Sequence, residues 1–194
     1  MTLPPWGSLY FLGEICYAYH KGGVAMKLKK LTALAILTAL ALILFIIEAQ
    51  IPPLVPIPGV KLGIANVVTV FCVFAIGSKE AAAVLCCRVF LGAVFAGNFS
   101  TIFYSAAGGL CAILVTVLLK RILTRKQLWV AGCLGAMAHS VGQMAAAVII
   151  TGTPGIAIYL PVMLAISIVT GCFTGLCAQI MLNRGDKLWK TTFR

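Results

Sequence analysis

Long apolar runs separated by short polar segments occupy most of this chain. The first run covers about residues 31–49, which is long enough to cross the ~30 Å hydrocarbon core of a bilayer. The later runs cover about residues 62–76, 81–96, 99–119, 128–150 and 156–182. This pattern predicts an all-α integral membrane protein with about six transmembrane helices.

The second and third runs are short for full spans, and only Ser78, Lys79 and Glu80 separate them. They fit either two thin spans or one re-entrant hairpin, and both arrangements leave the direction of the later helices unchanged. The segment at residues 50–59 contains prolines at positions 52, 53, 56 and 58. It cannot be helical, because each proline lacks a backbone donor and restricts the residue before it.

Basic residues flank the apolar runs on one side only. They precede the first run, separate the fourth from the fifth and follow the last. These residues are Lys27, Lys29, Lys30, Lys120, Arg121, Arg125, Lys126, Arg184, Lys187, Lys190 and Arg194. The intervening loops at residues 52–59, 97–98 and 152–155 contain no Lys or Arg. This positive-inside pattern predicts a multi-pass protein of the cytoplasmic membrane with both ends in the cytoplasm.

Composition excludes a soluble domain. The chain is 62% hydrophobic and 10% charged, with a mean hydropathy of +1.09, whereas a soluble domain of this size needs far more polar surface. The net charge of +11 lies beside the apolar runs rather than along one stripe, which disfavours nucleic-acid binding. The basic residues are therefore expected to contact anionic lipid headgroups.

The chain divides into three parts. Residues 1–25 show no clear period, whereas Met26 followed by three lysines and an apolar helix is typical of the start of a membrane protein. We therefore hypothesise that translation begins at Met26 and that residues 1–25 are an upstream extension. Residues 26–184 are expected to form the transmembrane domain, and residues 185–194 a basic cytoplasmic tail.

Small residues recur four apart in the apolar runs, a spacing that lets helix backbones approach closely in a membrane. Ala35 and Ala39 form such a pair in the first run, Gly132 and Ala136 in the fifth, and Gly171 and Gly175 in the last. Close packing within the bundle explains most of these pairs.

Several polar residues lie at or near membrane depth, where a charge in mid-helix costs ~2.5–3.5 kcal/mol and is therefore a functional candidate. The topology places Glu48, Lys61, Asn66 and Asn98 toward the outer side. Arg88, His139 and Gln143 lie nearer mid-depth, and His139 and Gln143 share a helix face because they are four apart. The pattern predicts an outward-facing pocket for an anionic or heteroaromatic ligand. Its predicted ligand contacts are Arg88, Asn66, Asn98, His139 and Gln143.

Structural alternatives exist for each of these residues. Glu48 and Lys61 form either a lid pair over the pocket or a simple interfacial ion pair. Arg88 binds a ligand, pairs with Glu48 or bonds loop carbonyls, and His139 with Gln143 binds a ligand or links neighbouring helices.

The sequence does not favour an enzyme. Its four acidic residues are Glu14, Glu48, Glu80 and Asp186, and no two of them are near each other in sequence, as a paired-carboxylate Mg²⁺ site would require. The eight cysteines include no C-x-x-C pair and no zinc-like cluster. We expect no metal and no cofactor.

The run from Pro58 to Thr69, PGVKLGIANVVT, follows a first helix that ends in Ile47-Glu48. It resembles the family of small bacterial membrane proteins labelled Gx transporter or heptaprenyl diphosphate synthase component I. The similarity extends from Met26 to about Asn183 and includes Gly97-Asn98-Phe99 and His139-Ser140. A prenyl diphosphate synthase needs aspartate-rich motifs, so a chain with a single Asp is expected to be at most an accessory.

The family is also similar to the S components of energy-coupling-factor (ECF) vitamin transporters. That resemblance implies six helices, an outer ligand site under a loop that acts as a lid, and a small-residue stripe on the first helix. The stripe docks a transmembrane coupling subunit, with two ATPases beneath it. Ala35 and Ala39 match the stripe, and residues 48–66 match the lid and its hinge.

Two functions follow as expectations. The first is the substrate-binding membrane component of a transporter for a vitamin-like small molecule, energised by separate subunits. The alternative is a non-catalytic membrane subunit associated with isoprenoid or quinone synthesis or with membrane electron transfer. In that alternative, apolar grooves bind a prenyl tail and Arg88 binds a diphosphate or quinone headgroup.

Overall fold

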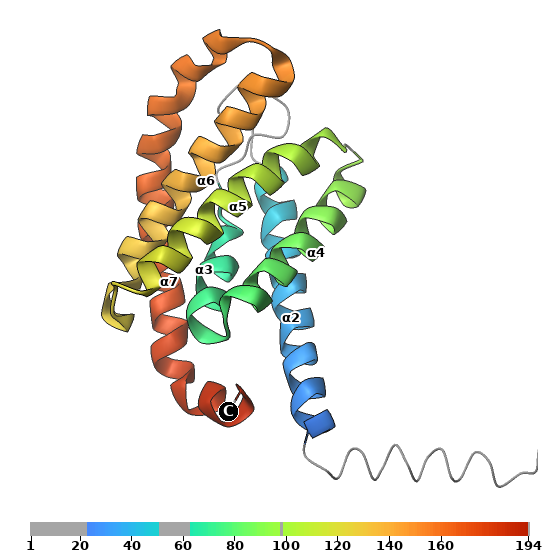
Figure 1. Cartoon of the computed structure of the whole chain (residues 1–194), viewed down its shortest axis with the longest axis vertical. Coiled ribbons are helices and arrows are strands. Elements are labelled where there is room, and N and C mark those ends of the chain that lie inside the picture. The colour runs from blue at the N-terminus through green and yellow to red at the C-terminus, as the bar shows by residue number, and fades with distance from the viewer. Residues whose placement is uncertain (1–22, 51–62, 98, 194) are drawn as a thin grey trace, which may run out of the picture.

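The computed structural model describes residues 23–50, 63–97 and 99–193, and that part of the chain is helical without strands. The described part of the chain contains six α-helices and two 3₁₀ segments (Figure 1). The helices are α2 (Gly23–Ala49), α3 (Asn66–Ala75), α4 (Ser78–Ala96), α5 (Ser100–Lys120), α6 (Leu128–Thr151) and α7 (Leu160–Phe193), with η1 (Arg125–Gln127) and η2 (Pro154–Tyr159). The prediction of an all-helical chain is confirmed.

Four segments are long and apolar enough to cross a membrane: Leu28–Ala49, Ser100–Lys120, Leu128–Thr151 and Pro154–Gly185. Helix α4 has 19 residues but carries Lys79, Glu80 and Arg88, and α3 has only ten residues. The chain therefore has the helices of a multi-pass membrane protein, and the second and third apolar runs form a hairpin with unequal arms.

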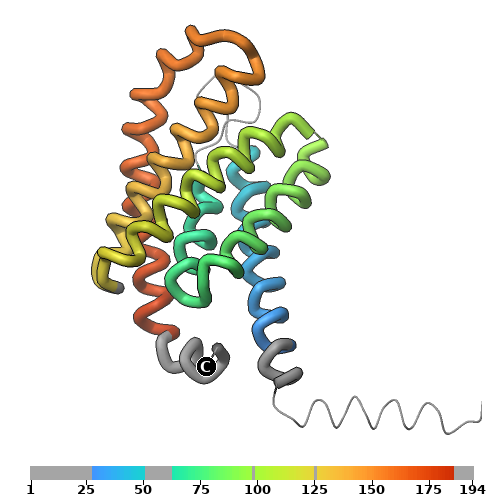
Figure 2. Tube along the Cα trace, viewed as in Figure 1, coloured from blue at the N-terminus to red at the C-terminus, as the bar shows by residue number. Residues whose placement is uncertain are grey.

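The short helix α3 is the centre of the bundle. It contacts each of the other five α-helices in the described part of the chain. Figures 1 and 2 show α6 and α7 on one side of it, α2 and α4 on the other, and α5 crossing in front of it. Seven of its ten residues are buried, including Phe71 and Val73. At ~1.5 Å per residue, α3 is ~15 Å long, which is about half the ~30 Å thickness of a hydrocarbon core.

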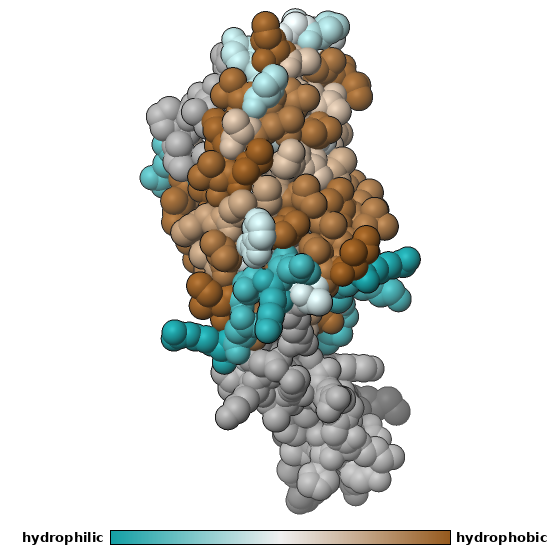
Figure 3. All heavy atoms as spheres, turned by 90° about the vertical axis from the view of Figure 1, so that its left-hand side faces the viewer, coloured by the Kyte–Doolittle hydropathy of each residue, from teal (hydrophilic) through white to brown (hydrophobic). Residues whose placement is uncertain are grey.

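Successive helices run in opposite directions, so the start of α2 and the end of α7 lie at the same end of the molecule (Figure 1). Hydrophilic residues gather near that end below a broad apolar surface (Figure 3). Large apolar side chains such as Leu114, Ile149 and Val169 are exposed on the helices. This distribution suits a protein whose outer surface contacts lipid.

Glycines bring α6 and α7 into backbone contact. A Cβ atom on Gly132 would lie 2.5 Å from both the Gly171 carbonyl oxygen and the Gly175 Cα atom. The close packing predicted for Gly132, Gly171 and Gly175 is therefore present. Ala35 and Ala39, by contrast, are exposed on α2.

We predict that Gly132→Leu lowers the thermal unfolding temperature of the detergent-purified protein. The added side chain forces α6 away from α7, and overpacking of this kind costs ~1–3 kcal/mol or more. Gly155→Ala is the matched control, because a Cβ atom on Gly155 meets nothing within 4 Å. Equal unfolding temperatures for the two variants would contradict this account of the α6–α7 contact.

Candidate functional site

Polar residues from four helices meet around the beginning of α3. Glu48 of α2, Asn66 of α3, Arg88 of α4, and His139 and Gln143 of α6 are all buried. The sequence predicted these five as members of one polar region, and the described contacts bring them together. Asn98 and Lys61, the other predicted site residues, lie outside the described residues.

Glu48 holds the start of α3. Its carboxylate accepts hydrogen bonds from the backbone N–H groups of Gly63 and Ile64, the second at 3.0 Å. Gly63 and Ile64 belong to the turn before α3, and their carbonyl oxygens accept from the Asn66 and Val67 N–H groups at 2.9 and 3.2 Å. Glu48 therefore fixes the turn that leads into α3, at the end where the helix dipole favours an anion. The proposed lid pair with Lys61 stays a prediction.

Gly63 places Glu48 close to His139. Its φ of +80° lies in the left-handed region that favours glycine. A Cβ atom on Gly63 would lie 3.1 Å from the His139 Cδ2 atom. The backbone at Gly63 therefore contacts the imidazole ring while its N–H group binds the Glu48 carboxylate.

Arg88 places a guanidinium group inside the bundle beside these residues. It is 4% exposed and interacts electrostatically with both Glu48 and His139. No ion pair within 4.0 Å joins Arg88 and Glu48 among the described residues, so their predicted pairing stays a prediction. A buried arginine near a carboxylate is far less costly than an uncompensated one.

His139 and Gln143 lie where α5 approaches α6. A Cβ atom on Gly108 of α5 would lie 2.9 Å from the His139 Cε1 atom and 2.7 Å from the Gln143 Cγ atom. The imidazole ring thus lies between Gly63 and Gly108, and Gln143 packs against α5. Both interpretations of this pair, as a helix link and as a ligand contact, fit this position.

Asn66 extends the polar region deeper into the bundle. Gly135 precedes His139 by one helical turn, and a Cβ atom there would lie 3.6 Å from Asn66 Nδ2 and 3.0 Å from Thr116 Oγ1. Thr116 of α5 is fully buried and was not predicted. A hydroxyl group in an apolar helix gives no sequence signal, because Thr can bond its own backbone at little cost.

Four atoms of this region are buried without a hydrogen-bond partner among the described residues: Asn66 Nδ2, Arg88 Nε, Thr116 Oγ1 and His139 Nδ1. An unpartnered buried donor or acceptor costs ~1–3 kcal/mol, so each of these four atoms needs an explanation, such as an ordered water, an ion or a ligand. We refer to Glu48, Asn66, Arg88 and His139 as the inner polar cluster.

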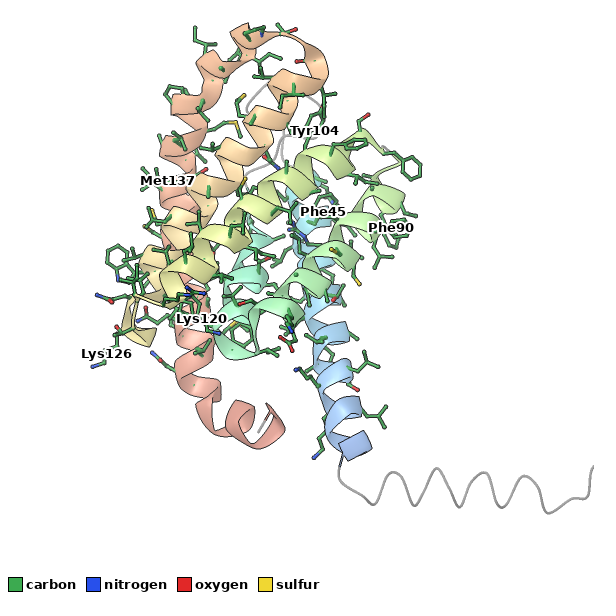
Figure 4. All side chains as sticks on the ribbon, in the orientation of Figure 1. Phe45, Phe90, Tyr104, Lys120, Lys126 and Met137 are labelled. Atoms are coloured by element: carbon green, nitrogen blue, oxygen red, sulfur yellow. The ribbon has the colours of Figure 1, made fainter. Side chains whose placement is uncertain are left out.

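Two further ionic contacts lie at the other end of α3 and were not predicted. Lys120 donates to the Val73 carbonyl oxygen at 2.5 Å, near the end of α3. Figure 4 shows Lys120 near this end of the bundle and Lys126 farther out. Lys30 of α2 binds Glu80 of α4, also at 2.5 Å. In the sequence, Lys30 and Lys120 resemble the other basic residues that flank apolar runs, so no pattern predicts their contacts.

Comparison with known proteins identifies the family. The model of the heptaprenyl diphosphate synthase component I family matches residues 37–181, which is well over half of the chain. The chain belongs to this family, as its sequence predicted. No curated protein and no solved structure matches the chain. These comparisons therefore show no similarity to an ECF S component.

We predict that Glu48→Gln destabilises the protein by ~1.5–3 kcal/mol, because it removes the charge that strengthens the hydrogen bonds from the Gly63 and Ile64 N–H groups. Arg88→Met removes the buried guanidinium group that interacts electrostatically with Glu48, and we expect it to be destabilising too. The double variant should lose less than the sum of the two, with a coupling of ~0.5–3 kcal/mol. Denaturant unfolding in detergent measures all three.

The matched control for this cycle is Lys30→Met with Glu80→Gln. This pair is partly exposed, with side chains 41% and 22% accessible, so its coupling should stay below ~1 kcal/mol. Additive losses for Glu48 and Arg88 would show that the two side chains do not depend on each other.

Proposed function

We propose that this member of the heptaprenyl diphosphate synthase component I family is a non-catalytic membrane subunit that binds an isoprenoid compound for a partner enzyme or redox protein. The unpartnered polar atoms of the inner polar cluster carry this proposal. They supply hydrogen-bonding groups at membrane depth that the described chain does not use itself. The family description connects the chain to isoprenoid synthesis.

The acidic residues support a non-catalytic role. Prenyl transfer requires several carboxylates around Mg²⁺, and this chain has one aspartate and three glutamates. The two described glutamates already have structural partners. Glu48 binds the backbone at Gly63 and Ile64, and Glu80 binds Lys30. A partner protein would therefore supply the chemistry.

We further propose that the basic end of the molecule faces the cytoplasm. Lys120, Arg121 and Lys126 are exposed at the α5–α6 connection, at the end where α2 begins and α7 finishes. By the positive-inside rule, both ends of the helical domain are cytoplasmic. The inner polar cluster then lies toward the outer half of the bilayer, because Glu48 is at the far end of α2.

A second candidate function is the substrate-binding component of a transporter with separate energising subunits. The exposed pair Ala35 and Ala39 favours it. Residues two positions apart in a helix point ~200° apart around its axis. Ala35 and Ala39 are each two positions from the buried Leu37, so both lie roughly opposite it. A small-residue face directed away from the bundle suits close packing of a helix from another subunit, such as a coupling protein.

Purification from native membranes in mild detergent distinguishes the two candidates. Mass spectrometry would identify both the associated proteins and the retained small molecules. A prenylated lipid together with a biosynthetic or redox partner supports the first proposal. Paired ATPases with a vitamin-like ligand would overturn it in favour of the transporter.

We predict that Ala35→Leu combined with Ala39→Leu abolishes co-purification of partner proteins while ligand retention persists. The larger side chains prevent close approach of a partner helix. The matched control is Ala145→Leu with Ala165→Leu, which makes the same change at exposed alanines on α6 and α7. Partner recovery unchanged by the α2 variant would exclude this face as the docking surface.

A further inference from the structure

Two cysteines lie side by side where the backbones of α6 and α7 touch. Cys133 of α6 follows Gly132, and Cys172 of α7 follows Gly171. A Cβ atom on Gly171 would lie 2.7 Å from the Cys133 Cα atom, so the two helices are in contact at this level. The Cys133 and Cys172 thiol groups interact with each other, and both are free thiols.

This arrangement suits a disulfide bond. Such a bond needs Cα atoms ~4.4–6.8 Å apart and Cβ atoms that point toward each other. Helices in backbone contact bring neighbouring residues to such separations, and the interaction between the two thiol groups shows that they face one another. The sequence does not mark the pair, because its two members come from different helices.

A second pair of cysteines provides a contrast. Cys86 and Cys87 are neighbours in the sequence of α4, and both are exposed. Adjacent residues in a helix point ~100° apart around its axis, so their thiol groups diverge. Exposure of two nearby thiols is therefore not sufficient for a disulfide, and this pair serves as a control.

The pair on α6 and α7 is partly exposed on the apolar surface of the bundle. Val169 and Leu176 lie on the same face of α7 as Cys172, and they are 71% and 47% exposed. On α6, Trp129 precedes Cys133 by one turn and is 45% exposed. Figure 3 faces the side of the molecule where α6 and α7 lie, and the surface above the basic end is mostly apolar. A reagent that reaches these thiols therefore comes through lipid.

These surroundings select the class of oxidant. Glutathione and thioredoxin keep thiols reduced in the cytoplasm, but both are water-soluble, and a charged group is costly to move into an apolar medium. Cys133 lies five residues after Leu128, the first residue of α6, or ~8 Å along the helix. An uncharged, lipid-soluble acceptor of two electrons, such as a quinone, enters this region without that cost.

We propose that Cys133 and Cys172 form a reversible disulfide between α6 and α7, with a lipid-soluble quinone as the oxidant. Each thiol loses one proton and one electron, and one S–S bond forms between the two Sγ atoms. The quinone takes up the two electrons and two protons and becomes a hydroquinone. A small dithiol reverses the reaction by thiol–disulfide exchange. The proposal uses no residue of the inner polar cluster, so it does not rest on the proposed function.

The disulfide is expected to stabilise the bundle. It closes a loop that contains most of α6 and the first part of α7, and such a crosslink limits the freedom of the unfolded chain. The unfolding temperature of the oxidised protein should therefore exceed that of the reduced protein by ~5 °C or more.

The test uses the full chain, reduced and then placed in lipid nanodiscs without oxygen. The oxidant is decylubiquinone, whose fully substituted ring disfavours addition of a thiol to a ring carbon. Free thiols are alkylated at intervals, and peptides are analysed by mass spectrometry. We expect a linked peptide pair that contains Cys133 and Cys172, two fewer alkylated cysteines, and release of the link by dithiothreitol. Oxidised glutathione at the same concentration should react at least ~10-fold more slowly.

Cysteine-to-serine variants provide the controls. Cys133→Ser and Cys172→Ser should each abolish both the linked peptide and the rise in unfolding temperature, whereas Cys86→Ser with Cys87→Ser should leave both unchanged. Failure of the quinone to produce the linked peptide in the folded protein would overturn the proposal, as would a link from Cys172 to a different cysteine. Equal rates with decylubiquinone and oxidised glutathione would overturn the assignment of a lipid-soluble oxidant.

Discussion

The capping of α3 is the constraint on which this bundle depends. A helix leaves four N–H and four C=O groups without internal partners, and inside a membrane each such group is costly. A full span exposes these groups at the two interfaces, but a ten-residue helix surrounded by five others cannot. The turn at residues 63–65 accepts from the first N–H groups of α3, and Glu48 binds the N–H groups of Gly63 and Ile64 in that turn. Lys120 donates to the Val73 carbonyl oxygen near the end of α3. The Glu48 carboxylate near the start of α3 and the Lys120 ammonium group near its end also match the direction of the helix dipole.

This constraint explains only part of the polar region. It accounts for Glu48, and it gives Arg88 the secondary role of compensating the carboxylate. It does not account for the donors at Asn66 Nδ2 and Arg88 Nε, since an apolar side chain at position 66 would pack in α3 at lower cost. A purely structural cluster would be expected to satisfy its own donors. These unpartnered donors are therefore the observation on which the proposed ligand site depends.

The sequence predicted most of the helices, because apolar runs in a membrane protein are continuous. The run at residues 128–150 became α6 (Leu128–Thr151), for example. Its prediction for 62–76 was too long, because Gly63 adopts a left-handed conformation and Glu48 caps the chain there. Buried charged and amide groups were predicted because they are expensive in lipid. Thr116 was not predicted, because burying a hydroxyl group in a helix costs much less free energy than burying a charge. Lys120 was not predicted either, because it resembles the other basic residues beside apolar runs.

Helix α2 lies between the inner polar cluster and the face proposed to bind a partner. One face carries Phe45 and Glu48, and the opposite face exposes Ala35 and Ala39. Contacts with α4 hold this helix at two levels, through the ion pair of Lys30 with Glu80 and through the packing of Phe45 against Gly92. A partner that tilts α2 would therefore disturb the cap on α3 and the orientation of Arg88 together. The partner proposed for the alanine face would thus act on the inner polar cluster through α2.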